Sequence, residues 1–339
     1  MTTVKIIRPG KVEVSETARP ERKPGTALLR ILYGGICGSD LGTYRGNLPY
    51  VSYPRTPGHE FSAEVVEVDE NEYGIRPGMI VTANPYFNCG KCYSCRRGLV
   101  NCCSSNETMG VQREGAFSDY ITMPVSRIYD GKGLDPRILA MVEPFCISYH
   151  GIRRSGVLPG EKVLVVGAGT IGLLAAISAK MRGALVYVCD VVPEKLEFAK
   201  QFGIDGVICN TDSETFRKRV EEIAGDDGFD ITVEAVGLPQ TLQNCFDAVC
   251  LGGKVVVIGV GKKNLDFDFT VIQKKELNIF GSRNAVKADF EEVIDLLKEK
   301  RAEISPLISK VFPAEEAAEA FAWFDATPDA VKVLLNFTK

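Results

Sequence analysis

Residues 162–172 read KVLVVGAGTIG, and this segment is the strongest indication of fold class in the chain. An apolar run typical of a buried strand is followed at once by three glycines. The first glycine permits a tight turn, the second lets the backbone approach a pyrophosphate, and the third allows a helix to pack closely on the strand. The N-terminus of that helix would offer its free N–H groups to the phosphates. We therefore expect a dinucleotide site that includes Gly167, Gly169, Thr170, Ile171 and Gly172.

Downstream of this stretch, β-rich runs alternate with helical patterns as far as residue 284. The expected strands are residues 162–166, 186–190, 206–209, 230–236, 254–258 and 277–280. The expected helices between them are residues 170–181, 194–202, 214–224 and 240–249. This alternation predicts an α/β fold with a doubly wound parallel sheet of the Rossmann type.

Asp190 ends the second expected strand, about 20 residues beyond the glycines, where a carboxylate commonly binds the adenosine ribose. A carboxylate there would repel a 2′-phosphate, and the residues that follow, VVP at 191–193, include no arginine to bind one. These features favour NAD over NADP, although Lys195 is close enough to interact with a phosphate. The alternative is a glycine-rich turn in an α/β protein that binds nothing.

The rest of the chain predicts a second domain. The first 150 residues are rich in short β-like runs broken by Gly and Pro, such as LLRILYGG at 28–35, which suggests a β-barrel or sandwich with long loops. We place this domain in residues 1–152 and the dinucleotide domain in residues 153–286. After residue 287 an amphipathic helix precedes the runs ISKVF and VKVLLNF. A tail of this length is too short to bury a core alone, so we expect residues 287–339 to rejoin the first domain.

The composition excludes several classes of function. Lys and Arg number 40 against 44 Asp and Glu, and no basic run appears, so nucleic acid and anionic lipid are not expected partners. The longest apolar run, residues 163–179, contains three glycines and is shorter than the ~20 residues that span a bilayer. The N-terminus lacks the apolar core of a secretory signal. Eleven cysteines in such a chain favour a cytoplasmic protein whose thiols are metal ligands or core residues.

Four of these cysteines have the spacing of a structural zinc site. Cys89, Cys92, Cys95 and Cys103 lie within fifteen residues of a loop that has few apolar side chains. Four thiolates close the tetrahedral sphere of Zn²⁺, so that no water can bind and the loop is held in place by the metal. Cys102 does not fit this spacing, so we do not count it among the zinc ligands. A cluster of unliganded or redox-active thiols is the alternative.

A catalytic metal needs protein ligands and one open position. The chain has two histidines, and His59 lies in a GHE triplet before a β-like run. Cys37 ends another β-like run, and Glu143 is a carboxylate inside the apolar stretch ILAMVEPFCI. Each residue alone is better explained by a structural role, so the argument for a metal is their combination. His150 does not belong to this group of candidates, and we interpret it as structural or close to the cofactor.

Four motifs in a fixed order, GICGSD, GHE, CxxCxxCxxxxxxxC and GAGTIG, give the chain a resemblance to a known family. The sequence resembles the zinc-dependent medium-chain dehydrogenases over essentially its whole length. The resemblance implies a GroES-like catalytic domain, a Rossmann domain, C-terminal elements that return to the catalytic domain, and an active site in the cleft between the domains. It also implies two zinc ions per chain, NAD as the cofactor, and a homodimer or homotetramer.

The resemblance assigns roles to individual residues of this sequence. Cys37 and His59 match the catalytic zinc ligands, and the third ligand falls on Glu60 or Glu143, which family members can exchange. Ser39 matches the hydroxyl that carries the substrate proton away, and Asp40 matches a residue that orients His59. Lys195 matches a residue that helps to hold the adenosine ribose. The segments that line the nicotinamide are matched by Ile258, Gly259, Val260, Ser282 and Arg283.

The activity implied is the oxidation of a small-molecule alcohol, in which zinc lowers the pKa of the hydroxyl and the nicotinamide accepts the hydride. Stretches such as YPRTPGHE and KKELNIFGSRNA are most similar to the sugar-acid branch, the L-galactonate and L-gulonate 5-dehydrogenases. An aldonate carboxylate would need a cation, and Arg283 or Arg113 could bind it through two hydrogen bonds. Either arginine could instead contact the cofactor or be solvated.

Two other functions stay open at this point. The first keeps the chemistry but changes the substrate to a polyol such as sorbitol, or to L-threonine. The second is a non-catalytic NAD(H)-binding protein or a zinc or redox sensor that has kept the fold. The presence of Cys37, His59, Glu60 and Glu143 together argues against the second, because non-catalytic relatives usually lack the ligands.

Overall fold

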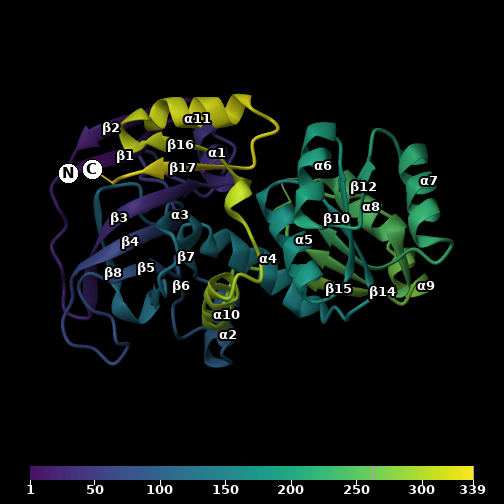
Figure 1. The fold of residues 1–339 in the computed structure, drawn as a ribbon, viewed down its shortest axis with the longest axis horizontal. Coiled ribbons are helices and arrows are strands. Elements are labelled where there is room, and N and C mark those ends of the chain that lie inside the picture. Colours follow the sequence, from purple (N-terminus) through teal and green to yellow (C-terminus); the bar gives the residue numbers. More distant parts are fainter. Residues whose placement is uncertain (262, 339) are drawn as a thin grey trace. The chain divides into compact units, whose positions relative to one another are not determined.

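The computed structural model describes residues 1–261 and 263–338, and these residues form two compact units (Figure 1). One unit consists of Met1–Glu143 together with Val286–Lys339, and the other of Pro144–Ala285. The boundary at Glu143 lies inside helix α4 (Val142–Ser155) and differs from the predicted boundary at residue 152. The prediction used the turn VLPG, which follows this helix, and turn residues do not show which unit the helix before them joins.

The second unit contains the predicted doubly wound sheet. Its six strands are all parallel and lie in the order β12-β11-β10-β13-β14-β15. The chain order therefore reverses between β10 and β13, the point where such sheets bind ligands at the carboxyl ends of their strands. The strands are β10 (Lys162–Val166), β11 (Leu185–Asp190), β12 (Gly206–Cys209), β13 (Phe229–Glu234), β14 (Val249–Val257) and β15 (Asn278–Gly281).

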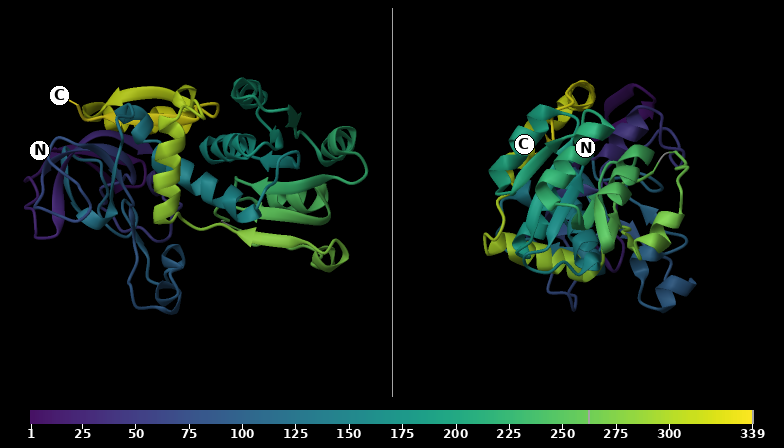
Figure 2. Two further views of the ribbon diagram at one scale, coloured as in Figure 1. Left: turned by 60° about the horizontal axis from the view of Figure 1, so that its bottom comes forward. Right: turned by 90° about the vertical axis from the view of Figure 1, so that its right-hand side faces the viewer.

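Helices pack against this sheet, as right-handed crossovers between parallel strands require (Figure 2). Helix α5 (Thr170–Met181) follows the glycine turn and contacts β10 and β11. It is apolar on most of its surface, and eight of its twelve residues are buried. The other helices of the unit are α6 (Pro193–Ala199), α7 (Ser213–Ala224), α8 (Pro239–Ala248) and α9 (Thr270–Lys274). Helix α9 was not expected, because only five residues form it.

The first unit is built round a sheet of seven strands, in the order β16-β17-β3-β4-β5-β9, with β8 paired to β3. Two small antiparallel pairs, β1-β2 and β6-β7, complete its strands. Their bounds are β1 (Thr2–Arg8), β2 (Lys11–Glu16), β3 (Thr26–Ile36), β4 (Glu60–Glu67), β5 (Ile80–Ala83), β6 (Tyr86–Phe87), β7 (Glu107–Thr108), β8 (Tyr120–Pro124), β9 (Ile128–Asp130), β16 (Ile308–Pro313) and β17 (Lys332–Asn336). The β-rich first domain predicted from the sequence is confirmed.

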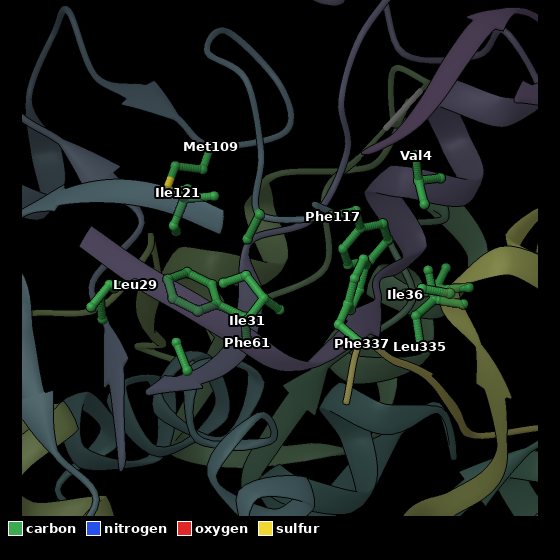
Figure 3. Close-up of a cluster of buried hydrophobic side chains, with 14 of the residues drawn as sticks. Val4, Leu29, Ile31, Ile36, Phe61, Met109, Phe117, Ile121, Leu335 and Phe337 are labelled. Carbon is green, nitrogen blue, oxygen red and sulfur yellow. The ribbon is translucent and has the colours of Figure 1, made fainter. Parts of the chain in front are cut away.

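The core of this unit holds the segment before β4 in place. Phe61, Phe117 and Phe337 are buried together, and the rings of Phe117 and Phe337 lie 6.3 Å apart (Figure 3). Phe117 lies so close to Gly58 that a Cβ on this glycine would be 2.2 Å from the ring, and Gly58 has a φ of +98°. A glycine is therefore required at this position, directly before His59.

The C-terminal elements belong to the first unit. Helix α10 (Lys287–Lys298) packs there through Phe290, whose ring stacks on Tyr129 with centroids 4.9 Å apart. Strand β17 then pairs antiparallel with β3. The remaining helices of this unit are α1 (Gly38–Tyr44), α2 (Tyr93–Arg96), α3 (Pro136–Leu139) and α11 (Ala317–Ala326). None of the helices in the described part of the chain combines the length and the apolar character needed to cross a membrane.

The third glycine of the turn should be the most sensitive one for stability. A Cβ on Gly172 would lie 1.7 Å from the carbonyl oxygen of Gly167, whereas a Cβ on Gly169 would meet nothing within 4 Å. We expect Gly172→Ala to lower the free energy of unfolding by about 1–3 kcal/mol, because α5 must move away from the turn. Gly169→Ala is the matched control and should leave the thermal midpoint, measured without dinucleotide, nearly unchanged. Equal midpoints for the two variants would contradict this account.

Candidate functional site

The four predicted cysteines come together in a small lobe between β6 and β7. The sulfurs of Cys89, Cys92, Cys95 and Cys103 all lie within 4.8 Å of one another. The lobe has almost no core, since no residue of α2 is buried. Backbone N–H groups donate to the sulfurs, from Cys92 to Cys89 at 3.3 Å and from Cys89 to Cys103 at 3.2 Å. Such bonds stabilise thiolates, and the pKa of Cys92 is lowered to about 5, chiefly by backbone donors.

This arrangement fits a closed tetrahedral zinc site. Four sulfur donors surround one point, and helix α2, which carries one of them, buries no residue. Cys102 is exposed and is not part of the group. A metal would therefore stabilise the lobe, as the spacing of the cysteines predicts.

A second group of donors forms where β3 ends and β4 begins. Cys37 directly follows β3, Glu60 opens β4, and His59 lies just before it; one donor atom from each of the three lies within 4.8 Å of the others. The register places Glu60 opposite Gly35. A Cβ on Gly35 would be 2.3 Å from Oε2 of Glu60, so the close approach of the carboxylate depends on this glycine.

Asp40 fastens the two segments that carry these donors. It is buried, and its two oxygens accept hydrogen bonds from the backbone N–H groups of Cys37, at 2.9 Å, and Gly58, at 3.2 Å. That Asp40 orients His59 stays a prediction; its two backbone hydrogen bonds tie Cys37 to Gly58, the residue directly before His59. Burial raises the pKa of Asp40, and the charge of His59 opposes that shift.

Two buried polar atoms of this group have no hydrogen-bond partner in the described structure, Nδ1 of His59 and Oγ of Ser39. Buried polar atoms are nearly always satisfied, so each such atom suggests a ligand. A thiol, an imidazole and a carboxylate are donors that Zn²⁺ prefers, and three protein donors leave a position open. The residues therefore fit a catalytic zinc ion.

Glu143 lies next to this group but not within it. It is buried at the start of α4 and accepts a hydrogen bond from the hydroxyl of Tyr86. Burial raises the pKa of Glu143 to about 7, against the lowering effect of His59 and with a further rise from Glu60. The structure thus brings Glu60, and not Glu143, within 4.8 Å of the cysteine and histidine donors.

Two residues at this site, Tyr86 and Lys332, were missed by the sequence analysis. Lys332 forms an ion pair with Glu60, with its Nζ 2.6 Å from Oε2. The available signal was a lysine at the start of the apolar run KVLLNF, where a charge is unusual. Tyr86 precedes the cysteine lobe in an ordinary strand pattern, and nothing in the sequence connects it with Glu143.

The two arginines suggested for substrate binding lie in different units. Arg113 stacks on the ring of Phe87 at 3.8 Å and forms an ion pair with Glu107. Phe87 follows Tyr86 in β6, and successive side chains of a strand point to opposite faces. Arg113 is therefore not gathered with the second donor group. Arg283 is exposed in the second unit, in the segment after β15.

The glycine turn has the geometry of a dinucleotide site. Gly169 occupies the N-cap position of α5. A Cβ on this residue would meet no protein atom within 4 Å, so packing does not require a glycine here. A glycine that the protein's own packing does not need fits the close approach of a pyrophosphate. Asp190 ends β11, where Oδ2 accepts from the N–H of Ala168 at 2.7 Å.

The other predicted cofactor residues lie at the carboxyl ends of the same sheet. Ile258 and Gly259 follow β14 and donate their N–H groups to the carbonyl of Glu234, at 2.9 Å and 3.0 Å. Ser282 follows β15 and has a buried, unpartnered Oγ, while Lys195 is half-buried on α6. Exposed apolar side chains follow three of the strands: Val191, Val236, Leu238 and Val260. These side chains would be covered by a bound dinucleotide, so the residues fit NAD or NADP.

The cysteine lobe should account for one metal ion per chain. We expect Cys92→Ser to reduce the zinc content from two ions to one and to lower the thermal midpoint, because the lobe has no core to replace the metal. Cys102→Ser, one residue from Cys103 but outside the group, should keep both ions. Zinc per chain is measured by atomic emission on the purified variants. An unchanged zinc content in Cys92→Ser would show that the lobe holds no metal.

Glu143 should make the metal-free protein sensitive to pH. Because its pKa is raised from 4.5 to about 7, the folded state binds the proton more tightly than the unfolded state. The stabilisation is complete below pH 4.5 and is lost as pH rises towards about 7. We expect the thermal midpoint of chelator-treated protein to fall over this range relative to that of Glu143→Gln, in which no charge can form. Parallel curves for the two proteins would contradict the burial of an ionisable group here.

Comparisons with known proteins agree with this geometry. Residues 23–132 match the alcohol dehydrogenase GroES-like domain, and residues 170–299 match the zinc-binding dehydrogenase domain. The L-galactonate-5-dehydrogenase of Escherichia coli K12 is 36% identical over 295 residues, which cover 87% of this chain and 86% of that protein. The sorbitol dehydrogenase of Halalkalibacterium halodurans is 33% identical over 325 residues, 94% of each chain.

A solved structure shows the same fold over both units. A putative zinc-binding dehydrogenase from Sinorhizobium meliloti, bound to NADP, has a TM-score of 0.91 and 28% sequence identity, and the match covers 99% of this chain and 98% of that one. The resemblance given by the four motifs is thereby confirmed, as are the GroES-like and Rossmann domains. The chain belongs to the family of zinc-dependent medium-chain alcohol dehydrogenases.

Proposed function

We propose that this protein oxidises a secondary alcohol of a sugar acid to the keto acid, with one catalytic zinc ion and with NAD as hydride acceptor. The observation that carries the proposal is the convergence of Cys37, His59 and Glu60 on one point, with two unpartnered buried polar atoms beside them. A second zinc ion would be structural and held by the four-cysteine lobe.

The residues of the second donor group have distinct roles in this reaction. Cys37, His59 and Glu60 would hold zinc, which supplies a Lewis acid that lowers the pKa of the substrate hydroxyl. Ser39 has a buried hydroxyl without a partner, and we assign it the transfer of the hydroxyl proton away from the site. Asp40 keeps Cys37 and the segment before His59 in place through its backbone hydrogen bonds. Glu143 is the further carboxylate that could replace Glu60.

The glycine turn and the strand ends of the second unit would bind the cofactor. The N-terminus of α5 and Gly169 would bind the pyrophosphate of NAD, which would supply the hydride acceptor. We favour NAD over NADP because Asp190 ends β11 with a carboxylate and the next residue is an exposed valine. A 2′-phosphate beside this carboxylate would meet repulsion and no cation in the segment VVP.

The choice of a sugar acid rests on the resemblance of the chain to L-galactonate-5-dehydrogenase. A substrate of the L-galactonate or L-gulonate type would be oxidised at its 5-position. Its carboxylate requires a cation, and Arg283 and Arg113 are the two arginines that we propose for this role; Arg113 also stacks on Phe87 and pairs with Glu107. The second candidate substrate is a neutral polyol, which the similarity to a sorbitol dehydrogenase supports.

The proposal is tested by NADH formation in the purified, zinc-loaded enzyme. We expect kcat/KM to be highest for L-galactonate or L-gulonate, lower for sorbitol and L-threonine, and lower with NADP than with NAD. Cys37→Ser should reduce turnover by about 10³-fold or more, because the Lewis acid is lost. Cys102→Ser is the control and should keep the native rate.

The outcomes separate the parts of the proposal. If sorbitol or threonine is the better substrate and Cys37→Ser abolishes its turnover, the metal chemistry is right and the sugar-acid assignment is wrong. If Cys37→Ser turns over as fast as the native enzyme, the catalytic metal site is wrong. Binding of zinc and NAD without turnover of any alcohol would favour a sensor.

A further inference from the structure

An arginine at the edge of the seven-stranded sheet contacts the strand that leads into the cysteine lobe. Arg127 lies directly before β9, which pairs with β5 of that sheet. Its Nη1 donates to the carbonyl oxygen of Tyr86, and its Nη2 lies 2.8 Å from Oδ1 of Asn88. The guanidinium group also lies over the ring of Phe87, 4.6 Å from the ring centroid. Arg127 therefore contacts all three residues that precede the first cysteine of the lobe.

The side chain of Asn88 continues this contact into the lobe. Its Oδ1 accepts from Arg127, and its Nδ2 donates to Sγ of Cys95 at 3.8 Å. With the amide turned the other way, its N–H₂ group would face the guanidinium donors, so Arg127 determines that the amide nitrogen faces the sulfur. Hydrogen bonds in a chain polarise one another, and the charge of the guanidinium group therefore strengthens the amide as a donor to sulfur.

A guanidinium group in this place has a cost. The side chain of Arg127 is half-buried, and Arg113 lies over the same Phe87 ring, 3.8 Å from its centroid. Burial and the like charge of Arg113 both lower the pKa of Arg127. A neutral side chain would avoid both costs, so the arginine calls for a role that uses its charge and its planar pair of donors.

We propose that Arg127 is a positioning residue that directs the Asn88 amide onto Cys95 and thereby slows the loss of metal from the four-cysteine lobe. A donor to a metal-bound sulfur fixes the orientation of the ligand, and removing such partners typically costs about 10–100-fold in metal affinity. The inference rests on the proposed function, because it requires the structural zinc ion at the four cysteines.

The release of the Cys92-dependent zinc ion to excess chelator measures this role. We expect Asn88→Ala, which removes the donor, and Arg127→Met, which removes the charge and both hydrogen bonds, to release this ion about tenfold or more faster than the native protein. Arg97→Met is the matched control. Arg97 is exposed in the same lobe and lies over the ring of Tyr93, 5.3 Å from its centroid, so this variant loses the same charge and should release zinc at the native rate.

A double variant tests whether Arg127 acts through Asn88. Adding Arg127→Met to Asn88→Ala should change the release rate by less than about twofold, because the amide that the arginine directs is already absent. If Arg127→Met does not fold, Arg127→Lys takes its place; it keeps the charge but lacks the planar fork that bonds both Tyr86 and Asn88, and it should also release zinc faster.

The absorption of the Co²⁺-substituted lobe gives a readout that general loosening of the fold would not move. A thiolate that loses an N–H donor becomes richer in electrons, so its charge-transfer band to the metal shifts to longer wavelength. We expect this shift in Asn88→Ala and in Arg127→Met, and no shift in Arg97→Met.

Three results would overturn the inference: native zinc release in Arg127→Met, equal release in Arg127→Met and Arg97→Met, or effects of Arg127→Met and Asn88→Ala that multiply in the double variant without a band shift. The last would mean that Arg127 supports the lobe by packing alone. Cys92→Ser tests the proposed structural zinc separately. If this variant contains as much zinc as the native protein, the lobe holds no metal and the inference is wrong together with that part of the proposal. If it loses one ion while Arg127→Met releases zinc normally, only the role of Arg127 is wrong.

Discussion

Strand β3 is the constraint on which the catalytic unit depends. It pairs with β4 on one edge, while its other edge is shared by β8, opposite Thr26 to Arg30, and by β17, opposite Tyr33 to Ile36. Backbone hydrogen bonds thus fix three strands from distant parts of the sequence against one another. Because Cys37 follows the last residue of β3, Glu60 opens β4 and Lys332 opens β17, the same pairing brings their side chains to one place.

The cost of burying charge shapes the rest of this site. Each buried charged group here has a specific partner. Asp40 accepts from two backbone N–H groups, and Glu143 accepts from the hydroxyl of Tyr86. Glu60 and Lys332 form an ion pair with each other. Buried charges without partners would destabilise the fold by several kcal/mol each.

Much of the fold follows from patterns along the chain. The glycine turn, α5 and most strands of the parallel sheet were predicted with nearly the observed bounds, because β-rich runs, glycine spacing and helical periodicity are local signals. Strand β14 begins at Val249, earlier than the predicted residue 254. The strands ISKVF and VKVLLNF were also expected near their observed places, as β16 and β17. The domain boundary was less accurate, since helix α4 continues across it and its residues are helical on both sides of the change.

For the sites, the donor types and the four-cysteine spacing could be predicted from the sequence, because ligands within fifteen residues depend on local chain geometry. That Glu60 lies within reach of Cys37 and His59, and that Tyr86 and Lys332 are the partners of the two glutamates, follows from the folded chain. Glu60 and Lys332 are 272 residues apart, and strand pairing alone brings them into contact. A contact of this kind is a property of the sheet register, which no local pattern of residues reveals.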